Sequence, residues 1–313
     1  MAANKKEIKL RGVVAPVITV FNPDETVDEV GMLAHIRFLL DHGVQGLVIG
    51  GSSAEAVGMT AVERKRIAEL TVSEFGSMAS VCIATSAYRT KDSIELSQHA
   101  QAIGANSIMV IPPYYMGLTK KHVFAHYEAI ASCVDLPILL YDNPGASGVV
   151  LDVSEIAGFF SRGLIQGVKL TLDRGDTSQV HELRYLCGPN LLIFYGADTC
   201  ALEGLLCGAD GWISTLINLI PKISRLFCDT ALSGNRDEAC AIWDKMLPLI
   251  NFETYVDTDR EPHWLSLVKS GLQALGYPVG KPRRPLLPLS EEHCKHLIQI
   301  LSSLQNAVES GKP

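Results

Sequence analysis

The sequence predicts an α/β fold, a (β/α)8 TIM barrel followed by a C-terminal helical extension. Short apolar segments recur at fairly even intervals, and amphipathic segments of helical periodicity, such as 30–40 and 62–75, separate them. This alternation is typical of parallel strands joined by crossover helices. The eight segments expected to be strands are 13–20, 46–50, 80–85, 107–111, 137–141, 165–170, 191–195 and 211–215.

Eight strand and helix alternations are the number that closes a barrel. A doubly wound open sheet is the alternative, but the sequence has neither the Gly-x-Gly-x-x-Gly of dinucleotide-binding folds after a strand nor a Walker A motif. We therefore expect one globular unit, with an N-terminal tail over 1–10, the barrel over 11–216, and the final helix region with the extension over 217–313. The helices predicted in this last region are 217–232, 236–255, 262–275 and 291–308.

Helix boundaries are predicted by capping residues. Thr60 and Thr90 are expected N-caps, and Glu63 three residues after Thr60 completes a capping box. Gly43 and Gly104 each follow an amphipathic segment and precede a predicted strand, a position typical of helix C-termini.

Composition excludes several classes of function. The net charge of -7 gives no electrostatic reason to bind nucleic acid or an anionic membrane. The one basic cluster, Lys281, Arg283 and Arg284, is interleaved with prolines and is interpreted as a solvated loop. The eight cysteines lack zinc-site spacing, and the N-terminus lacks the apolar stretch of a signal peptide, so we expect a cytoplasmic protein with free thiols.

Lys169 is the most informative residue, because it interrupts an otherwise apolar strand. Removing an ammonium group from water is costly, so an interior strand lysine either pairs with a carboxylate or works as a partly neutral amine. A neutral amine can attack a ketone to form an imine, which withdraws electrons from the neighbouring carbon. No acidic residue accompanies Lys169 on its strand, which favours the chemical role over a structural ion pair.

Other reactive groups follow predicted strands, where the active sites of such barrels lie. The segment 50–55 offers backbone amides and two hydroxyls to a carboxylate, or forms an ordinary turn. Tyr141 ends the fifth strand as a potential general acid or base, with Ser52 and Tyr115 as partners for proton transfer. Asp198, after the seventh strand, binds a polar substrate tail or caps the next helix.

A metal centre is not expected. His122 and His126 lie four residues apart on a predicted helix, a spacing that could bind a metal ion, but no third ligand is evident. We interpret the pair as part of a solvated helix face, and we expect neither a metal nor a cofactor.

Several of these motifs occur together in one family of proteins. The chain resembles the N-acetylneuraminate lyase and dihydrodipicolinate synthase superfamily of class I aldolases over roughly residues 10–300. The motifs that carry the resemblance are Arg11-Gly-Val-Val, Gly-Gly-Ser-Ser-x-Glu-Ala over 50–56, Pro113-Tyr-Tyr115, Tyr141-x-Asn-Pro, Gly167-Val-Lys169, Gly196-x-Asp198 and Ala209-Asp-Gly-x-Ile-Ser-Thr215.

The resemblance implies a barrel with a C-terminal helical extension, assembled as a homotetramer from paired dimers. It makes Lys169 the Schiff-base lysine, Tyr141 the proton shuttle and Ser52 its relay. Ser53 would bind the carboxylate of a 2-oxo acid, and Tyr115 would extend the relay, in many members from the adjacent subunit. Residues of the same motifs expected to bind substrate are Gly51, Thr171, Asp198 and Ser214.

Three departures from the family pattern bear on the substrate. Ala146 stands where dihydrodipicolinate synthases place an arginine for the second substrate's carboxylate, which argues against that activity. Ala54 replaces a glycine, which would alter the loop if the position needed a positive φ. Sialic acid lyases carry an acidic pair where this chain has Asp198 and Thr199, so a glycerol tail would lose one partner.

The expected activity is a class I lyase acting on a pyruvate-derived, hydroxylated 2-oxo acid such as a sugar acid. The alternative activity uses the same lysine imine but breaks a different bond of the substrate. The protein would then be a dehydratase or deaminase of a 2-oxo sugar acid or of an imino acid derived from hydroxyproline. A third possibility is a catalytically silent relative that binds a metabolite in the same cleft.

Overall fold

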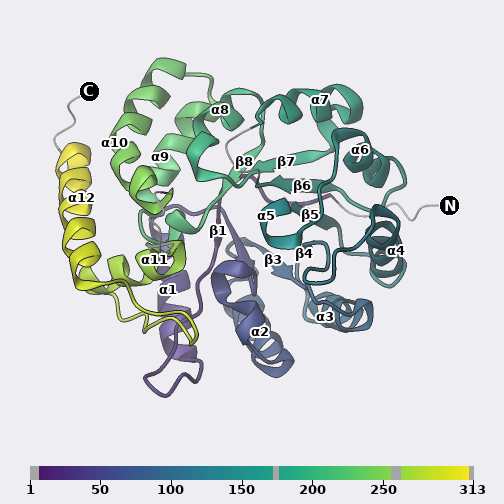
Figure 1. Cartoon of the computed structure of the whole chain (residues 1–313), viewed down its shortest axis with the longest axis horizontal. Coiled ribbons are helices and arrows are strands. Elements are labelled where there is room, and N and C mark those ends of the chain that lie inside the picture. The colour runs from purple at the N-terminus through teal and green to yellow at the C-terminus, as the bar shows by residue number, and fades with distance from the viewer. Residues whose placement is uncertain (1–6, 172–175, 255–261, 310–313) are drawn as a thin grey trace.

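The computed structural model describes residues 7–171, 176–254 and 262–309, so residues 1–6 of the predicted tail lie outside the described residues. Eight parallel strands close into a barrel in sequence order, with β1 paired to both β2 and β8 (Figure 1). The predicted TIM barrel is confirmed. The strands are β1 (Gly12–Pro16), β2 (Gly46–Ile49), β3 (Ser80–Ala84), β4 (Ser107–Val110), β5 (Ile138–Asp142), β6 (Gly167–Leu170), β7 (Leu192–Tyr195) and β8 (Gly211–Ile213).

Helices surround the barrel, and the last three described helices lie together beside it as the predicted C-terminal extension (Figure 1). The helices are α1 (Glu29–Asp41), α2 (Ala61–Phe75), α3 (Thr90–Ala102), α4 (Lys120–Ala131), α5 (Pro144–Ser147), α6 (Val153–Ser161), α7 (Ser178–Cys187), α8 (Ala201–Leu206), α9 (Pro221–Leu232), α10 (Arg236–Thr254), α11 (Trp264–Ala274) and α12 (Glu291–Glu309). No helix in the described residues is long and apolar enough to cross a membrane.

The strands are buried on both faces, which explains why they read as continuous apolar runs. Successive side chains point to opposite faces of a strand, so one set fills the barrel and the other packs against the helices. In β5, Leu139 and Tyr141 belong to the inner cluster, whereas Leu140 belongs to the outer one. In β6 the outer residues are Val168 and Leu170, so the side chain between them faces the barrel interior.

Most of the predicted boundaries are confirmed. Thr60 and Glu63 form the capping box of α2, and Gly43 and Gly104 follow helix ends with φ of 88° and 86°. The Thr90 prediction is wrong by one residue, because Arg89 is the N-cap of α3 and the Thr90 hydroxyl instead lies 2.9 Å from Nδ1 of a histidine on α4.

The first strand is shorter than its apolar run, which extends to residue 20. The backbone of this segment leaves the sheet, because the Ile18 N–H donates to Oδ1 of Asn218 and the Thr19 hydroxyl donates to the Ala54 carbonyl. Residues 17–20 remain buried beneath the loop that follows β2. Apolar character here therefore reports burial rather than strand pairing.

Candidate active site

Lys169 lies on β6 with its side chain in the barrel interior, and only 6% of its surface is exposed. Strand register pairs it with Tyr141 on β5, and its Nζ is 4.1 Å from the centroid of the Tyr141 ring. Within the described residues no carboxylate lies within 4.0 Å of this amine. The structural ion pair considered for Lys169 is therefore not found there, and the amine faces a phenol instead.

Tyr141 is buried at the end of β5, and its hydroxyl accepts a hydrogen bond of 2.9 Å from Nδ2 of Asn143. Burial alone would raise the pKa of this phenol, but the positive charge of Lys169 and the Asn143 hydrogen bond outweigh burial and lower the pKa. A phenol that ionises more easily than usual exchanges protons more readily near neutral pH. Tyr141 can therefore serve as an acid and base beside the amine.

Gly196 leaves room for the lysine side chain. A Cβ at this position would lie 2.5 Å from Cε of Lys169 and 2.3 Å from Oγ1 of Thr171, closer than such atoms approach in proteins. The glycine that follows β7 therefore lets the lysine side chain pass directly over the backbone. The sequence motif contains Gly196, but this steric role was not predicted.

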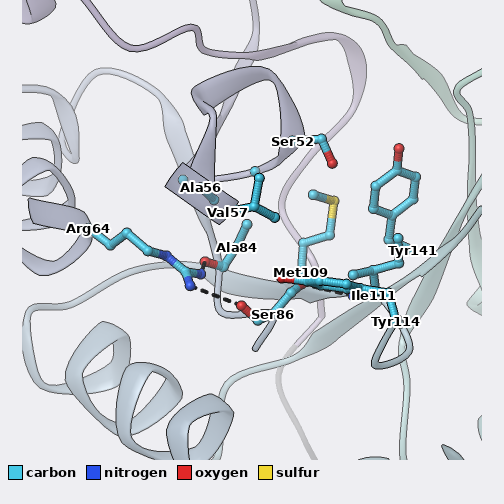
Figure 2. A pocket seen from close by; sticks show the side chains of 12 residues that line it. Ser52, Ala56, Val57, Arg64, Ala84, Ser86, Met109, Ile111, Tyr114 and Tyr141 are labelled. Atoms are coloured by element: carbon cyan, nitrogen blue, oxygen red, sulfur yellow. Dashed lines mark hydrogen bonds between the residues drawn. The ribbon is translucent and has the colours of Figure 1, made fainter. Parts of the chain in front are cut away.

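The two serines of the loop after β2 lie in different environments. Ser52 is exposed at a cavity of about 50 Å³ that Tyr141 also lines, and the two hydroxyl groups face the same space (Figure 2). Ser53 is buried, with its Oγ 2.7 Å from Oγ1 of Thr215. Gly51 lines the cavity with its backbone.

The Ala54 substitution does not disturb this loop. Ala54 lies in a short 3-10 turn, η1 (Ser52–Ala54), and is not among the residues with positive φ. The left-handed conformation falls on the next residue, Glu55, with φ of 60°. The expected alteration of the backbone at Ala54 is therefore not observed.

The cavity extends from Tyr141 toward α2 and includes residues that the sequence did not predict (Figure 2). Arg64 on α2 donates hydrogen bonds to the carbonyls of Ala84 and Ser86, and burial lowers its pKa. Tyr114 lines the cavity, whereas its neighbour Tyr115 does not. Tyr115 is 93% exposed and has a φ of 89°, so within one chain its ring projects into solvent.

A second polar group follows β7. Oδ1 of Asp198 accepts a hydrogen bond of 3.1 Å from Nε1 of Trp212. Burial raises the pKa of Asp198, and burial together with the adjacent Asp198 carboxyl raises the pKa of Glu253 well above its usual range. Glu253, near the end of α10, is a member of this group that the sequence did not reveal. Ser214 is buried next to Asp198, and its hydroxyl oxygen caps the following turn by accepting a hydrogen bond from the Leu216 N–H.

The histidine pair on α4 is not a solvated face, and that expectation was wrong for one of its members. His126 is buried, and its Nδ1 lies 2.9 Å from Oγ1 of Thr90. His122 is exposed and lies 3.1 Å from Oγ1 of Thr119. In the described ranges no three potential ligands gather as a metal site.

Comparison with known proteins gives one consistent result. The model of the dihydrodipicolinate synthetase family matches residues 9–304. A 4-hydroxy-tetrahydrodipicolinate synthase from Protochlamydia amoebophila (strain UWE25) is 31% identical over 298 residues, which covers 94% of this chain and 97% of the relative. The dihydrodipicolinate synthase from Acinetobacter baumannii complexed with pyruvate is 26% identical with a TM-score of 0.88, and the match covers 95% of this chain and 99% of that one. CdNal from Clostridium difficile in complex with mannosamine has a TM-score of 0.86 at 23% identity, with the same coverage, and shares the fold.

Proposed function

The chain belongs to the dihydrodipicolinate synthetase family, in the superfamily of class I pyruvate-type aldolases that also includes N-acetylneuraminate lyase, and from this premise we propose that it cleaves or forms a pyruvate-derived, hydroxylated 2-oxo acid through an imine at Lys169. The chain is an enzyme of the lyase class. The observation that carries the proposal is the buried Lys169 amine, which has a phenol of lowered pKa beside it and no carboxylate partner in the described residues.

The chemistry follows from the properties of the amine and the phenol. The Lys169 amine adds to the C2 carbonyl of the substrate, and loss of water gives a protonated imine. In the cleavage direction the ionised Tyr141 phenol accepts the proton of the C4 hydroxyl as the C3–C4 bond breaks. The electron pair of that bond enters the imine and leaves an enamine, and the aldehyde departs. Protonation of the enamine at C3 and hydrolysis release pyruvate and restore the amine.

Ser52 and Ser53 take different parts in this proposal. In this proposal the Ser52 hydroxyl relays protons, a role supported by the cavity that it shares with Tyr141. The backbone amides of Gly51 and its neighbours, together with Ser53, bind the substrate carboxylate, as small residues allow an anion to approach the backbone closely.

We propose a homotetramer, a dimer of dimers, in which Tyr115 serves the site of an adjacent copy. Its ring is almost fully exposed and does not reach the cavity of its own chain. Two further apolar side chains are exposed on loops that follow strands, Val57 after β2 and Met116 next to Tyr115 after β4, and burial of exposed apolar surface favours association.

The substrate is proposed to be a hydroxylated sugar acid rather than the second substrate of a dihydrodipicolinate synthase. Ala146 lies exposed in α5 and offers no cation to a carboxylate there. The polar groups available for substrate binding are instead the side chains of Thr171, Asp198 and Ser214. Their hydroxyl and carboxyl groups can form hydrogen bonds with the hydroxyl groups of a sugar acid. The proposed substrate therefore differs from that of the 31% identical 4-hydroxy-tetrahydrodipicolinate synthase.

Trapping with sodium borohydride tests the proposal. Reduction in the presence of pyruvate should attach the three-carbon acid covalently to Lys169, and peptide mass spectrometry should locate it there. Lys169→Ala should trap none, whereas Lys121→Ala, an exposed lysine on α4, should trap as much as the wild type. Absence of an adduct in the folded wild type would overturn the imine.

Product analysis separates the two imine-dependent reactions. An aldolase releases pyruvate and an aldehyde from hydroxylated 2-oxo acids, whereas a dehydratase or deaminase releases water or ammonia and keeps the carbon skeleton. Pyruvate release from a panel of 2-oxo sugar acids supports the proposed reaction. Turnover of the same panel without pyruvate release would replace it with the dehydratase or deaminase.

A further inference from the structure

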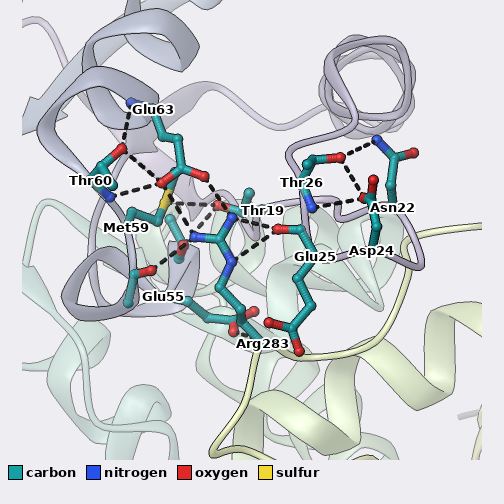
Figure 3. Close-up of polar contacts among 12 residues, drawn as sticks. Thr19, Asn22, Asp24, Glu25, Thr26, Glu55, Met59, Thr60, Glu63 and Arg283 are labelled. Atoms are coloured by element: carbon teal, nitrogen blue, oxygen red, sulfur yellow. Dashed lines mark hydrogen bonds and ion pairs between the residues drawn. The ribbon is translucent and has the colours of Figure 1, made fainter.

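Arg283 is not part of a solvated loop, contrary to the interpretation of its basic cluster. Its side chain is only 13% exposed, and its guanidinium lies 4.3 Å from the centroid of the Phe21 ring. Nη2 is 2.6 Å from Oε1 of Glu63, and Nη1 donates to the Gly58 carbonyl at 2.8 Å (Figure 3). Further bonds reach the Glu25 carbonyl. This residue, in the segment between α11 and α12, is therefore bound to the loop after β2 and to the start of α2.

Lys269 joins the extension to the same loop from α11. It has no exposed surface, and its Nζ is 2.6 Å from Oε1 of Glu55. The other carboxylate oxygen, Oε2 of Glu55, accepts the backbone N–H of Arg283 at 2.7 Å. Both oxygens of a glutamate in the barrel loop are thus bound by residues of the C-terminal extension, more than two hundred positions away in the sequence.

Glu55 controls the shape of the loop that carries the two serines. Its backbone is left-handed, with φ of 60° and ψ of 34°, a conformation that residues other than glycine rarely adopt. Its N–H donates to the Ser52 carbonyl at 2.9 Å and so closes the η1 turn that contains Ser52 and Ser53. A strained backbone persists only where its surroundings hold it, and the described contacts of the Glu55 side chain come from the extension.

We infer that Lys269 and Arg283 are positioning residues, through which the C-terminal extension holds the carboxylate-binding loop in its working conformation. The inference rests on the proposed function, because it assumes that this loop binds the substrate carboxylate. The extension is then part of the apparatus that sets affinity for 2-oxo acids. Two cations face two carboxylates in this contact, so the charges of Lys269, Arg283, Glu55 and Glu63 balance.

The first test compares two arginines. Arg283→Met removes the bonds to Glu63 and Gly58, whereas Arg184→Met removes an equally well bonded arginine at the opposite end of the barrel. Arg184 donates to carbonyls at 188, 191 and 208 and pairs with Asp210 at 2.8 Å. The probe is pyruvate with borohydride, measured as the pyruvate concentration that gives half-maximal trapping and as the maximal trapping rate.

A loosened carboxylate loop weakens binding more than it slows chemistry. Arg283→Met should therefore raise the half-saturating pyruvate concentration by about tenfold or more, with the maximal rate changed by less than about threefold. Arg184→Met should lower the melting temperature without this rise. Arg283→Lys, which keeps the charge but loses the forked geometry, should recover part of the affinity.

A second variant keeps the test decisive if Arg283→Met fails to fold. Glu55→Gln combined with Lys269→Met removes both buried charges together and leaves no unpaired ion. It should raise the half-saturating pyruvate concentration in the same way. Unchanged concentrations in the folded double variant, or equal effects of the two arginine variants, would overturn the inference. Failure of the wild type to trap pyruvate would instead overturn the proposed function.

Discussion

Asp142 sits at the end of β5 with no exposed surface, and in the described residues neither of its carboxyl oxygens has a hydrogen-bond partner. Strand alternation points this side chain away from the barrel interior, opposite to Tyr141. Burial raises the pKa of its carboxyl from 3.8 to about 7. A carboxyl in this setting is protonated in the native protein at mildly acidic pH, and it must lose its proton inside the protein as the pH rises.

The sign of the effect follows from proton binding. Between about pH 4 and pH 7 the native state holds a proton on Asp142 that the unfolded chain has released, so stability falls as pH rises through this window. For a native pKa of about 7 against 3.8, the contribution lost between pH 5 and pH 8 is roughly 2–3 kcal/mol. Asp142→Asn replaces the carboxyl with a group that stays neutral, so its own contribution does not change with pH.

Urea unfolding of both proteins at fixed protomer concentration, from pH 5 to pH 8, measures this difference. Relative to Asp142→Asn, the wild type should lose roughly 2–3 kcal/mol of unfolding free energy across the range. Asp135→Asn, which alters an exposed aspartate just before β5, provides the matched control and should run parallel to the wild type. Parallel curves for wild type and Asp142→Asn would refute the argument that this carboxyl is buried without a partner.

Three further substitutions probe the site. Gly196→Ala should abolish borohydride trapping, because its Cβ would meet Cε of Lys169 at 2.5 Å, and a variant that still traps at the wild-type rate would show that the lysine can move aside. Tyr141→Phe should keep the adduct but lower turnover by roughly 100-fold or more in steady-state assays, and unchanged turnover would exclude the phenol as acid and base. Glu253→Gln should unfold within about 1 kcal/mol of the wild type at pH 7, because burial and the adjacent Asp198 carboxyl raise the pKa of Glu253 and favour a neutral group at this position. A larger loss on urea unfolding would show that the carboxyl is charged.

The fold and the positions of Lys169 and Tyr141 could be predicted because both depend on local periodicity. Apolar runs mark the strands, and parallel strands bring their C-terminal ends to one face, so the strand positions of Lys169 and Tyr141 place the two side chains together. Arg283 and Glu253 could not be assigned in this way. Their partners, Glu63 and Asp198, are far away in the sequence, and no periodicity or motif links such pairs.

The backbone conformation of the loop that carries Ser52 and Ser53 could not be predicted from its sequence either. The substitution of Ala54 for a glycine suggested a change at that position, but the left-handed residue is Glu55. A glutamate can occupy this conformation here because its carboxylate is bound on both oxygens by the extension. Local propensity is overridden by a tertiary contact that the loop sequence does not contain.

Two buried lysines, Lys169 and Lys269, allow a direct comparison of the proposed reactive amine with a structural one. Each follows a valine in an apolar segment, and they are 6% and 0% exposed. Lys269 has a carboxylate at 2.6 Å, whereas Lys169 has the face of a phenol at 4.1 Å.

The two lysines should therefore respond in opposite ways to substitution by methionine, which retains the apolar stem. Lys269→Met leaves the Glu55 carboxylate buried and unpaired and should cost about 3–5 kcal/mol on urea unfolding. Lys169→Met breaks no ion pair in the described residues, and without the lysine charge the Tyr141 phenol keeps its proton, so the variant should be neutral or slightly stabilising while trapping is abolished. Equal losses of stability in the two variants would mean that Lys169 is held as a structural cation, and the reactive role argued from its surroundings would fail.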